Sequence, residues 1–181
     1  MMTETANPEL KRSDLALEIV RLAHLTGEFK LRSGQISNEY FDKYRFEAQP
    51  QVLKAIAEQM ASLIPPDCEI LAGLEMGGIP VATALSLHTG LPLCFVRKEA
   101  KDYGTCRLAE GLELKDKKAC VVEDVITTGG QVVTSCRQLR DLGASIESVI
   151  CVIDRSKGDH SKLTAANLQL KALFTMEELL G

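Results

Sequence analysis

Hydrophobic and polar residues alternate with different periods along the first third of the chain. Helical spacing predicts a helix from Ser13, its expected N-cap, to about Leu25. Residues 28–34 and 35–44 then alternate roughly in pairs around a Ser-Gly step, which predicts a β-hairpin. Helical spacing returns over 50–64 and stops at a Pro-Pro pair. These elements precede the main part of the chain.

From residue 70 onward, short apolar runs alternate with helical patterns. The predicted strands are 70–74, 93–96, 119–122 and 148–153, the predicted helices are 77–89 and 130–142, and 98–111 is a predicted polar loop. Continuous apolar strands separated by helices are typical of an α/β fold with a parallel sheet covered on both faces. Ligands of such sheets bind at the carboxyl ends of the strands. The hairpin and residues 168–180 fall outside this alternation and are expected to form a cap.

Composition narrows the functional classes. The chain has 181 residues, of which 45% are apolar and 25% charged, which fits one globular domain. A net charge of -4 argues against binding to nucleic acid or to an anionic membrane. Apolar runs are too short to span a bilayer, and the polar N-terminus lacks a signal-peptide core, so we expect a cytoplasmic protein.

The cysteines do not indicate a metal or redox centre. Six are scattered along the chain without a C-x-x-C pair, and the three histidines lack ligand spacing. Cys94, Cys120 and Cys151 lie inside apolar runs, where a cysteine is usually a small buried hydrophobe. Cys106 lies in the polar loop and is expected to be exposed.

The segment after the strand at 119–122 has the most specific chemistry. It reads Glu123-Asp124-Val125-Ile126-Thr127-Thr128-Gly129-Gly130-Gln131 and leads into a helix. Threonines and glycines at a helix N-terminus suit a phosphate group, because free amide groups and the helix dipole favour an anion. Two carboxylates repel phosphate, so they suit ribose hydroxyls or a metal instead. A sugar phosphate would use both halves, whereas a plain capped turn with two solvated acids is the alternative.

This segment identifies a family. VVEDVITTGGQV is very similar to the signature with which type I phosphoribosyltransferases bind phosphoribosyl pyrophosphate (PRPP). By this resemblance Glu123 and Asp124 contact the ribose hydroxyls, with Asp124 also catalytic, and residues 127–131 hold the 5′-phosphate. Val125 and Ile126 are expected among the PRPP-binding residues as well. The resemblance also implies an open, mostly parallel sheet flanked by helices, with a small hood built from both ends of the chain.

A basic loop follows the strand at 93–96. Arg97, Lys98 and Lys101 place three cations within five residues, and a solvated charged loop is the alternative. Departing pyrophosphate needs positive charge, and a loop closing over the substrate would exclude water. The loop resembles the Arg-Lys-Glu-x-Lys loop of orotate phosphoribosyltransferases. That resemblance makes Lys101 the catalytic lysine and assigns Arg97 and Lys98 to pyrophosphate, although Tyr103 stands where several members have histidine.

A glycine turn follows the strand at 70–74. Gly77 and Gly78 would let the backbone approach an anion closely. A plain tight turn leading into a helix is the alternative, because it would have the same sequence pattern. In the resembling family this is the pyrophosphate loop. Some members have lysine at the position of Gly77, so backbone amides would bind the pyrophosphate here.

The N-terminal hairpin and Arg155 point to orotate as the base. Tyr40 and Phe41 occupy positions where the resembling enzymes place two aromatics around the base, and Arg32 stands where they carry a lysine. Arg155 matches an arginine that these enzymes place on orotate, and Thr127 also falls at the base. Ordinary hairpin packing and a surface cation are the alternatives.

Together these features predict one phosphoribosyltransferase domain over 1–181, with a core of about 46–155 and a hood from about 1–45 and 156–181. The expected reaction is Mg²⁺-dependent transfer of phosphoribosyl from PRPP to orotate, with the metal carried mainly by PRPP rather than by a protein site. A phosphoribosyltransferase for another base, or a non-catalytic PRPP-sensing regulator, remains open. The resemblance also implies a homodimer whose loop 97–111 reaches the neighbouring site.

Overall fold

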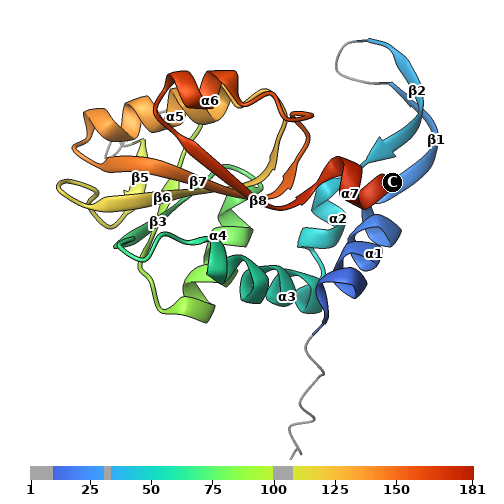
Figure 1. The fold of residues 1–181 in the computed structure, drawn as a ribbon, viewed down its shortest axis with the longest axis horizontal. Coiled ribbons are helices and arrows are strands. Elements are labelled where there is room, and N and C mark those ends of the chain that lie inside the picture. Colours follow the sequence, from blue (N-terminus) through green and yellow to red (C-terminus); the bar gives the residue numbers. More distant parts are fainter. Residues whose placement is uncertain (1–9, 31–33, 100–107) are drawn as a thin grey trace, which may run out of the picture.

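A computed structural model describes residues 10–30, 34–99 and 108–181. Its first elements are the helix α1 (Arg12–Ala23), the strands β1 (His24–Lys30) and β2 (Ile36–Phe41), the short helix α2 (Lys43–Glu47), the helix α3 (Pro50–Met60) and the single turn η1 (Ala61–Leu63). Strands β1 and β2 pair antiparallel, so the predicted hairpin is confirmed. Figure 1 shows the hairpin projecting from the body of the molecule.

The remaining elements build the central layer. In chain order they are β3 (Ile70–Leu74), α4 (Gly78–Thr89), β4 (Leu93–Val96), β5 (Ala109–Gly111), β6 (Lys118–Ile126), α5 (Gly130–Asp141), β7 (Ser145–Asp154), α6 (Ser161–Ala165), β8 (Gln169–Thr175) and α7 (Met176–Leu180). Six strands form one sheet in the order β5-β4-β3-β6-β7-β8. All neighbours in it are parallel except β4 and β5. The predicted α/β fold with a mostly parallel sheet is confirmed.

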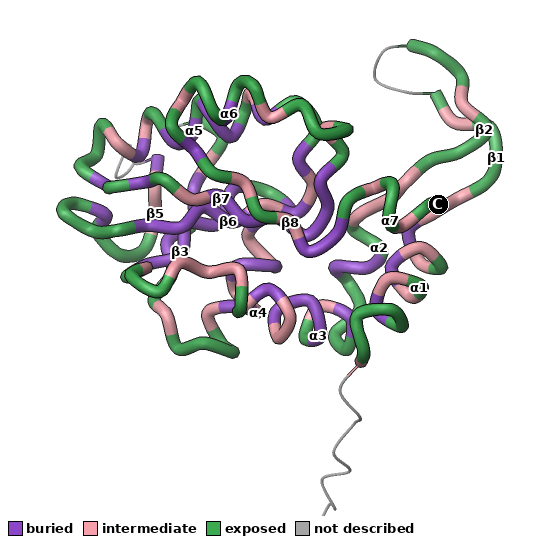
Figure 2. The backbone as a smooth tube through the Cα atoms, viewed as in Figure 1, coloured by how far each residue is buried: buried purple, intermediate pink, exposed green. Residues whose placement is uncertain are grey.

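Side chains alternate along each strand, so the two faces of the sheet pack into two separate hydrophobic cores. Along β6, Cys120 and Val122 pack with α1, α3 and α4 on one face, whereas Val121 packs with α5 and α6 on the other. This follows from the period of two in a strand and explains why the strand patterns are continuously apolar. Figure 1 shows helices on both sides of the sheet, and Figure 2 shows the central strands as its most buried part.

The two ends of the described chain pack together. The guanidinium of Arg12 donates to the Leu173 carbonyl at 2.8 Å, lies 4.5 Å from the centre of the Phe174 ring and forms a 2.9 Å ion pair with Glu178. Thr175 and Glu178 form a capping box at the start of α7. Helices α1 and α7 therefore lie side by side at one end of the sheet (Figure 1).

Several predicted boundaries were wrong. The first helix begins at Arg12 and ends at Ala23; its N-cap is Lys11, and Ser13 lies inside the first turn. The predicted loop 98–111 contains strand β5, which pairs with β4 because its backbone needs partners. Residues 169–175 were expected in the cap, but they form the edge strand β8. Because the pairing partner of a strand lies far away in sequence, local pattern could not reveal either strand.

The cysteine prediction holds where it can be checked. Cys94, Cys120 and Cys151 are fully buried, as expected of small hydrophobes. Cys106 lies outside the described residues. No helix in the described part of the chain is long and apolar enough to cross a membrane.

Candidate active site

The carboxyl ends of the parallel strands bring the predicted motifs together. Strands β3, β4, β6 and β7 run in the same direction, so the segments that follow them meet at one edge of the sheet (Figure 1). These segments contain the glycine turn, the start of the basic loop, the Thr-Gly segment and Arg155. Lys101 and Arg32 lie outside the described residues.

The Thr-Gly segment forms an open turn into α5. Thr127 and Thr128 are exposed, and Gly129 caps α5 with a φ of 68°, a left-handed conformation that favours glycine. A side chain at Gly129 would also press on Leu163 at 3.0 Å. The first amide groups of a helix have no partner within it, so this turn offers donors to an anion. Gln131 is exposed on the first turn of the helix.

Strand β6 extends further than the sequence predicted. Glu123, Asp124, Val125 and Ile126 were read as following the strand, but they continue its pairing with β7. The side chain of Ile126 is buried, and its carbonyl accepts from the Arg155 amide at 2.7 Å. Val125 and Ile126 therefore position the acids and the turn, and their side chains are part of the strand rather than of the Thr-Gly turn.

Asp124 lies against the glycine turn that follows β3. Its carboxylate occupies the space over Gly77, so any side chain at position 77 would overlap the Asp124 Oδ2 atom. A side chain at Gly78 would overlap the Val122 carbonyl oxygen. Both glycines are buried, and the peptide bond between Glu75 and Met76 is cis. The lysine that some resembling enzymes have at position 77 would not fit here.

Two charged residues that the sequence analysis missed reach these acids from α2. The Lys43 ammonium forms an ion pair with Asp124 Oδ2. Glu47, one turn further along α2, is 7% exposed and lies within hydrogen-bonding reach of the Asp124 carboxyl. Their i, i+4 spacing behind Asp42, a good N-cap residue, was an available signal for a short helix face. It did not indicate that this face meets β6.

Three carboxyl groups and one ammonium group thus share a buried space. Burial, followed by the proximity of Asp124, raises the pKa of Glu47 to about 9 and that of Glu123 well above its ordinary value. Burial alone would raise the pKa of Asp124, but hydrogen bonds with Glu123 and Lys43 outweigh it and the pKa is lowered. These shifts favour the protonated forms of Glu47 and Glu123 and the charged forms of Asp124 and Lys43, an arrangement that opposes an unpaired buried charge.

The two described cations of the basic loop differ in their surroundings: Arg97 has protein partners, whereas Lys98 is exposed. Arg97 donates its amide to the Leu108 carbonyl at 2.8 Å, and its guanidinium lies 3.4 Å from Glu110. Lys98, the second residue after β4, is exposed. Arg97 is thus anchored to the strand that flanks the loop, whereas Lys98 faces solvent.

The predicted base-binding residues are not all brought together within one chain. Tyr40 and Phe41 are neighbours on β2, so their side chains point to opposite sides of the hairpin. Tyr40 is 45% exposed beside Phe29, whereas Phe41 packs against Phe46 at the edge of the core. No ring contact or hydrogen bond joins Tyr40 to Arg155 among the described residues. That Tyr40 and Phe41 flank the base stays a prediction.

Arg155 stands on a well-fixed turn after β7. Asp154 accepts from the Ser156 amide at 2.8 Å and lies 2.8 Å from His160 Nε2. Burial would raise the pKa of Asp154, but the Ser156 and His160 contacts outweigh it and the pKa is lowered. The Arg155 side chain remains exposed at the carboxyl edge. Asp154 and His160 were missed because their contact depends on how the turn folds back.

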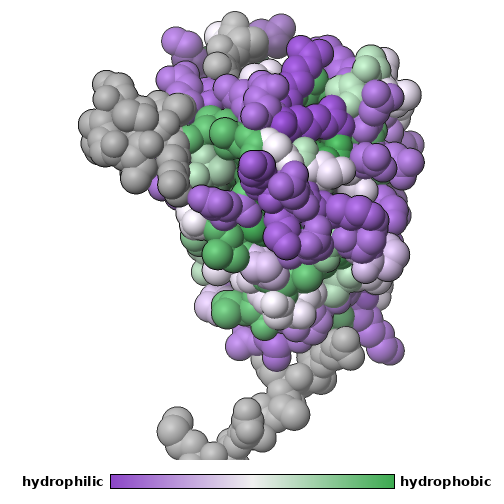
Figure 3. Space-filling view, turned by 90° about the vertical axis from the view of Figure 1, so that its left-hand side faces the viewer, coloured by the Kyte–Doolittle hydropathy of each residue, from purple (hydrophilic) through white to green (hydrophobic). Residues whose placement is uncertain are grey.

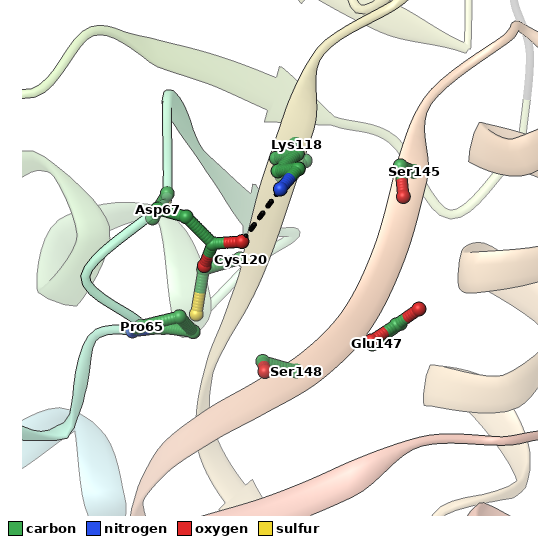
Figure 4. Close-up of a pocket in the computed structure, with 9 residues that line it drawn as sticks. Pro65, Asp67, Lys118, Cys120, Ser145, Glu147 and Ser148 are labelled. Carbon is green, nitrogen blue, oxygen red and sulfur yellow. Dashed lines mark hydrogen bonds and ion pairs between the residues drawn. The ribbon is translucent and has the colours of Figure 1, made fainter.

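A separate cavity lies at the opposite end of the strands. It has a volume of about 110 Å³, includes the starts of β6 and β7, and contains the 2.8 Å ion pair between Asp67 and Lys118 (Figure 4). Because ligands of parallel sheets bind at the carboxyl ends, this cavity is not the candidate active site.

Comparisons with known proteins agree with the geometry. The phosphoribosyl transferase domain family matches residues 44–169. An orotate phosphoribosyltransferase of Nocardioides sp. is 48% identical over 165 residues, covering 91% of this chain and 92% of the relative. The crystal structure of Mycobacterium tuberculosis H37Rv orotate phosphoribosyltransferase with Fe(III) dicitrate has a TM-score of 0.84 and 32% identity, covering 94% and 99% of the two chains.

A second structure of the Mycobacterium tuberculosis enzyme, in complex with PRPP, has a TM-score of 0.78 and 29% identity and covers 93% of this chain and 98% of the other. The sequence relatives cover almost the whole chain, and the family match includes both the acidic pair and the Thr-Gly segment. The chain therefore belongs to the phosphoribosyltransferase family and, within it, to the orotate phosphoribosyltransferases.

Proposed function

We propose that the protein transfers the 5-phosphoribosyl group of PRPP to N1 of orotate, releasing pyrophosphate and forming orotidine 5′-phosphate for UMP synthesis in the cytoplasm. The observation that carries this proposal is the meeting of an acidic pair and an open Thr-Gly helix N-terminus at the carboxyl edge of the sheet. A sugar phosphate has hydroxyls that the acidic pair can bind and a phosphate anion that the helix N-terminus can bind. The names of the relatives supply orotate as the base.

The proposed roles of the PRPP-binding residues follow from their placement. Residues 127–131 hold the 5′-phosphate with backbone amides and hydroxyls, and Gly77 and Gly78 bring their backbone close to the pyrophosphate. Glu123 and Asp124 contact the ribose hydroxyls. Because Asp124 is fully buried, this contact requires the groups that surround its carboxylate to move slightly.

The leaving group requires cations. Lys98 and Lys101, with Arg97 at the base of the loop, stabilise the charge that develops on pyrophosphate as its bond to the ribose breaks. On the base side, Arg155 pairs with the orotate carboxylate. The orotate site is completed by Thr127 and by three residues of the hairpin region, Arg32, Tyr40 and Phe41.

Magnesium fits this site as an ion that arrives with its substrate. No group of three or more His, Cys, Asp or Glu side chains among the described residues is arranged to hold a metal. The diphosphate oxygens would supply most of the ligands, as Mg²⁺ commonly requires in nucleotide and phosphate sites. When bound, the ion neutralises part of the pyrophosphate charge.

The test follows orotate absorbance in the presence of PRPP and Mg²⁺, omitting each in turn. We expect orotate consumption only with both present. Titration calorimetry with orotate, adenine, xanthine and uracil separates this activity from transfer to another base. A protein that binds PRPP but consumes none of these bases would instead be the non-catalytic PRPP sensor.

We further propose a homodimer in which loop 97–111 serves the neighbouring active site. Lys101→Ala and Asp124→Ala proteins, each nearly inactive, would then complement each other after subunit exchange. In mixed dimers one site lacks both residues and the other has both, so about a quarter of wild-type activity returns if half of the dimers are mixed. No recovery, with exchange verified by native mass spectrometry, would assign the loop to its own subunit.

A further inference from the structure

Helix α2 is anchored so that its first residue faces the acids. Asp42 caps the helix by accepting from the Tyr44 amide at 3.2 Å, and Phe46 is fully buried in the core. These two contacts fix the short helix between the hairpin and α3. Lys43 consequently reaches Asp124 Oδ2, while its ammonium also lies 5.2 Å from the centre of the Tyr44 ring.

The same carboxylate oxygen closes the space over Gly77. A lysine at position 77 cannot exist in this chain without displacing Asp124, because even a β-carbon there would overlap Oδ2. Lys43 brings an ammonium group to that oxygen from a different element. Helix α2 therefore supplies the cation near the glycine turn. Gly77 leaves room for the Asp124 carboxylate, with which Lys43 pairs.

We propose that Lys43 is a positioning residue of the active site, which keeps the Asp124 carboxylate charged and held against the glycine turn for PRPP binding. This inference rests on the proposed function, because it assigns Lys43 a role through Asp124. Removing one partner of a buried ion pair leaves an uncompensated charge, and the remaining group then tends to neutralise. Without Lys43, Asp124 would take up a proton and become a poorer acceptor for ribose hydroxyls.

The charged groups around Asp124 make the sign of this effect clear. Glu123 faces it from β6, and Lys43 and Glu47 face it from α2, while Asp42 acts electrostatically on Glu47. Of the described groups with these contacts, Lys43 alone is cationic. Its loss therefore moves the pKa of Asp124 upward, and PRPP binding should become weaker on the acid side.

The experiment measures PRPP affinity by calorimetry in the presence of Mg²⁺, together with the pH profile of kcat/KM for PRPP. For Lys43→Met we expect PRPP affinity at pH 7 to fall about tenfold or more, the usual effect of losing a charge-assisted contact. The acid limb of the profile should move to higher pH. Lys43→Arg should restore both, because it retains the charge, and orotate binding should change little.

Lys54→Met is the matched control. Lys54 is 67% exposed on α3 and lies 3.6 Å from Glu58, so its loss should change neither measurement. If Lys43→Met fails to fold, Lys43→Gln is measured in its place. Unchanged or tighter PRPP binding by a folded variant, or equal losses for both substrates with an unmoved pH profile, would overturn the proposal. Because PRPP affinity is measured without a base, a wild-type protein inactive on orotate would refute the proposed function but still test Lys43.

Discussion

The two ends of the central sheet carry similar charged side chains in very different surroundings. At the amino ends of the strands, Lys118 pairs with Asp67 and Lys117 with Glu69, and all four side chains are 43–61% exposed. At the carboxyl ends, Asp124 is fully buried and its partner Lys43 is 31% exposed. Figure 3 shows one face of the molecule, on which hydrophilic side chains are interspersed with smaller hydrophobic areas.

The comparison distinguishes exposed charges, which water solvates, from buried charges, which the fold must compensate. Exposed ion pairs gain little over hydration, whereas a buried carboxylate needs a cation or a proton. The carboxyl end meets this need with Lys43 and with raised pKa values at Glu47 and Glu123. Strongly shifted ionisable groups in one place are typical of functional sites.

Asp124→Asn should lower kcat/KM for PRPP by about tenfold or more, because a charged acceptor for the ribose hydroxyls contributes roughly 1.5–3 kcal/mol. Asp67→Asn, the matched change at the amino end, should leave the kinetic constants unchanged. Steady-state kinetics of both variants, with thermal unfolding to verify folding, provide the measurement. Wild-type constants for Asp124→Asn would refute the ribose assignment.

Arg155→Ala should raise the KM for orotate about tenfold while changing the KM for PRPP much less, since the lost cation pairs with the orotate carboxylate. Its turn is held by Asp154, Ser156 and His160, so the fold should survive. Lys162→Ala, an exposed change on α6, is the control. An equal rise in both KM values would show that Arg155 does not bind the base.

Glu47→Gln should make stability less dependent on pH. The folded-state pKa of about 9 lies above the ordinary value of 4.5, so the folded state binds the proton more tightly. Wild-type stability then falls as pH rises from about 4.5 to 9, because the unfolded chain ionises first. Glutamine cannot ionise, so the variant should gain on the order of 1–3 kcal/mol at pH 8 and nothing at pH 4.

Urea unfolding of Glu47→Gln and wild type across this pH range provides the measurement. Glu69→Gln at the amino end is the matched control, because Glu69 is exposed and its pKa is lowered by contacts with Lys118 and Lys117. A constant difference between wild type and Glu47→Gln at all pH values would contradict a protonated Glu47.

Lys118→Met should have the smallest effect. Its ion pair with Asp67 is exposed, and such pairs contribute little to stability in water. We expect unfolding midpoints and kinetic constants to match wild type within experimental error, and added salt to leave the comparison unchanged. A clear loss of stability would show that the amino end is more tightly coupled to the core than its exposure suggests.

Local pattern was sufficient for the framework and for part of the site. Strands β3 and β4 begin and end where the apolar runs do, since buried parallel strands need continuous apolar residues. The Thr-Gly segment was recognisable because phosphate binding at a helix N-terminus needs a local order of residue types. These features depend on residues that are close in sequence, so the amino-acid sequence alone is enough to predict them.

Tertiary structure alone decided how distant segments complete the site. Residues 169–175 became an edge strand because β7 offered unpaired backbone groups. Lys43 meets Asp124 across 81 positions of sequence, and no local pattern indicates that contact. Burial, which exists only after folding, makes that charge pair matter, because it removes the water that would otherwise solvate both groups.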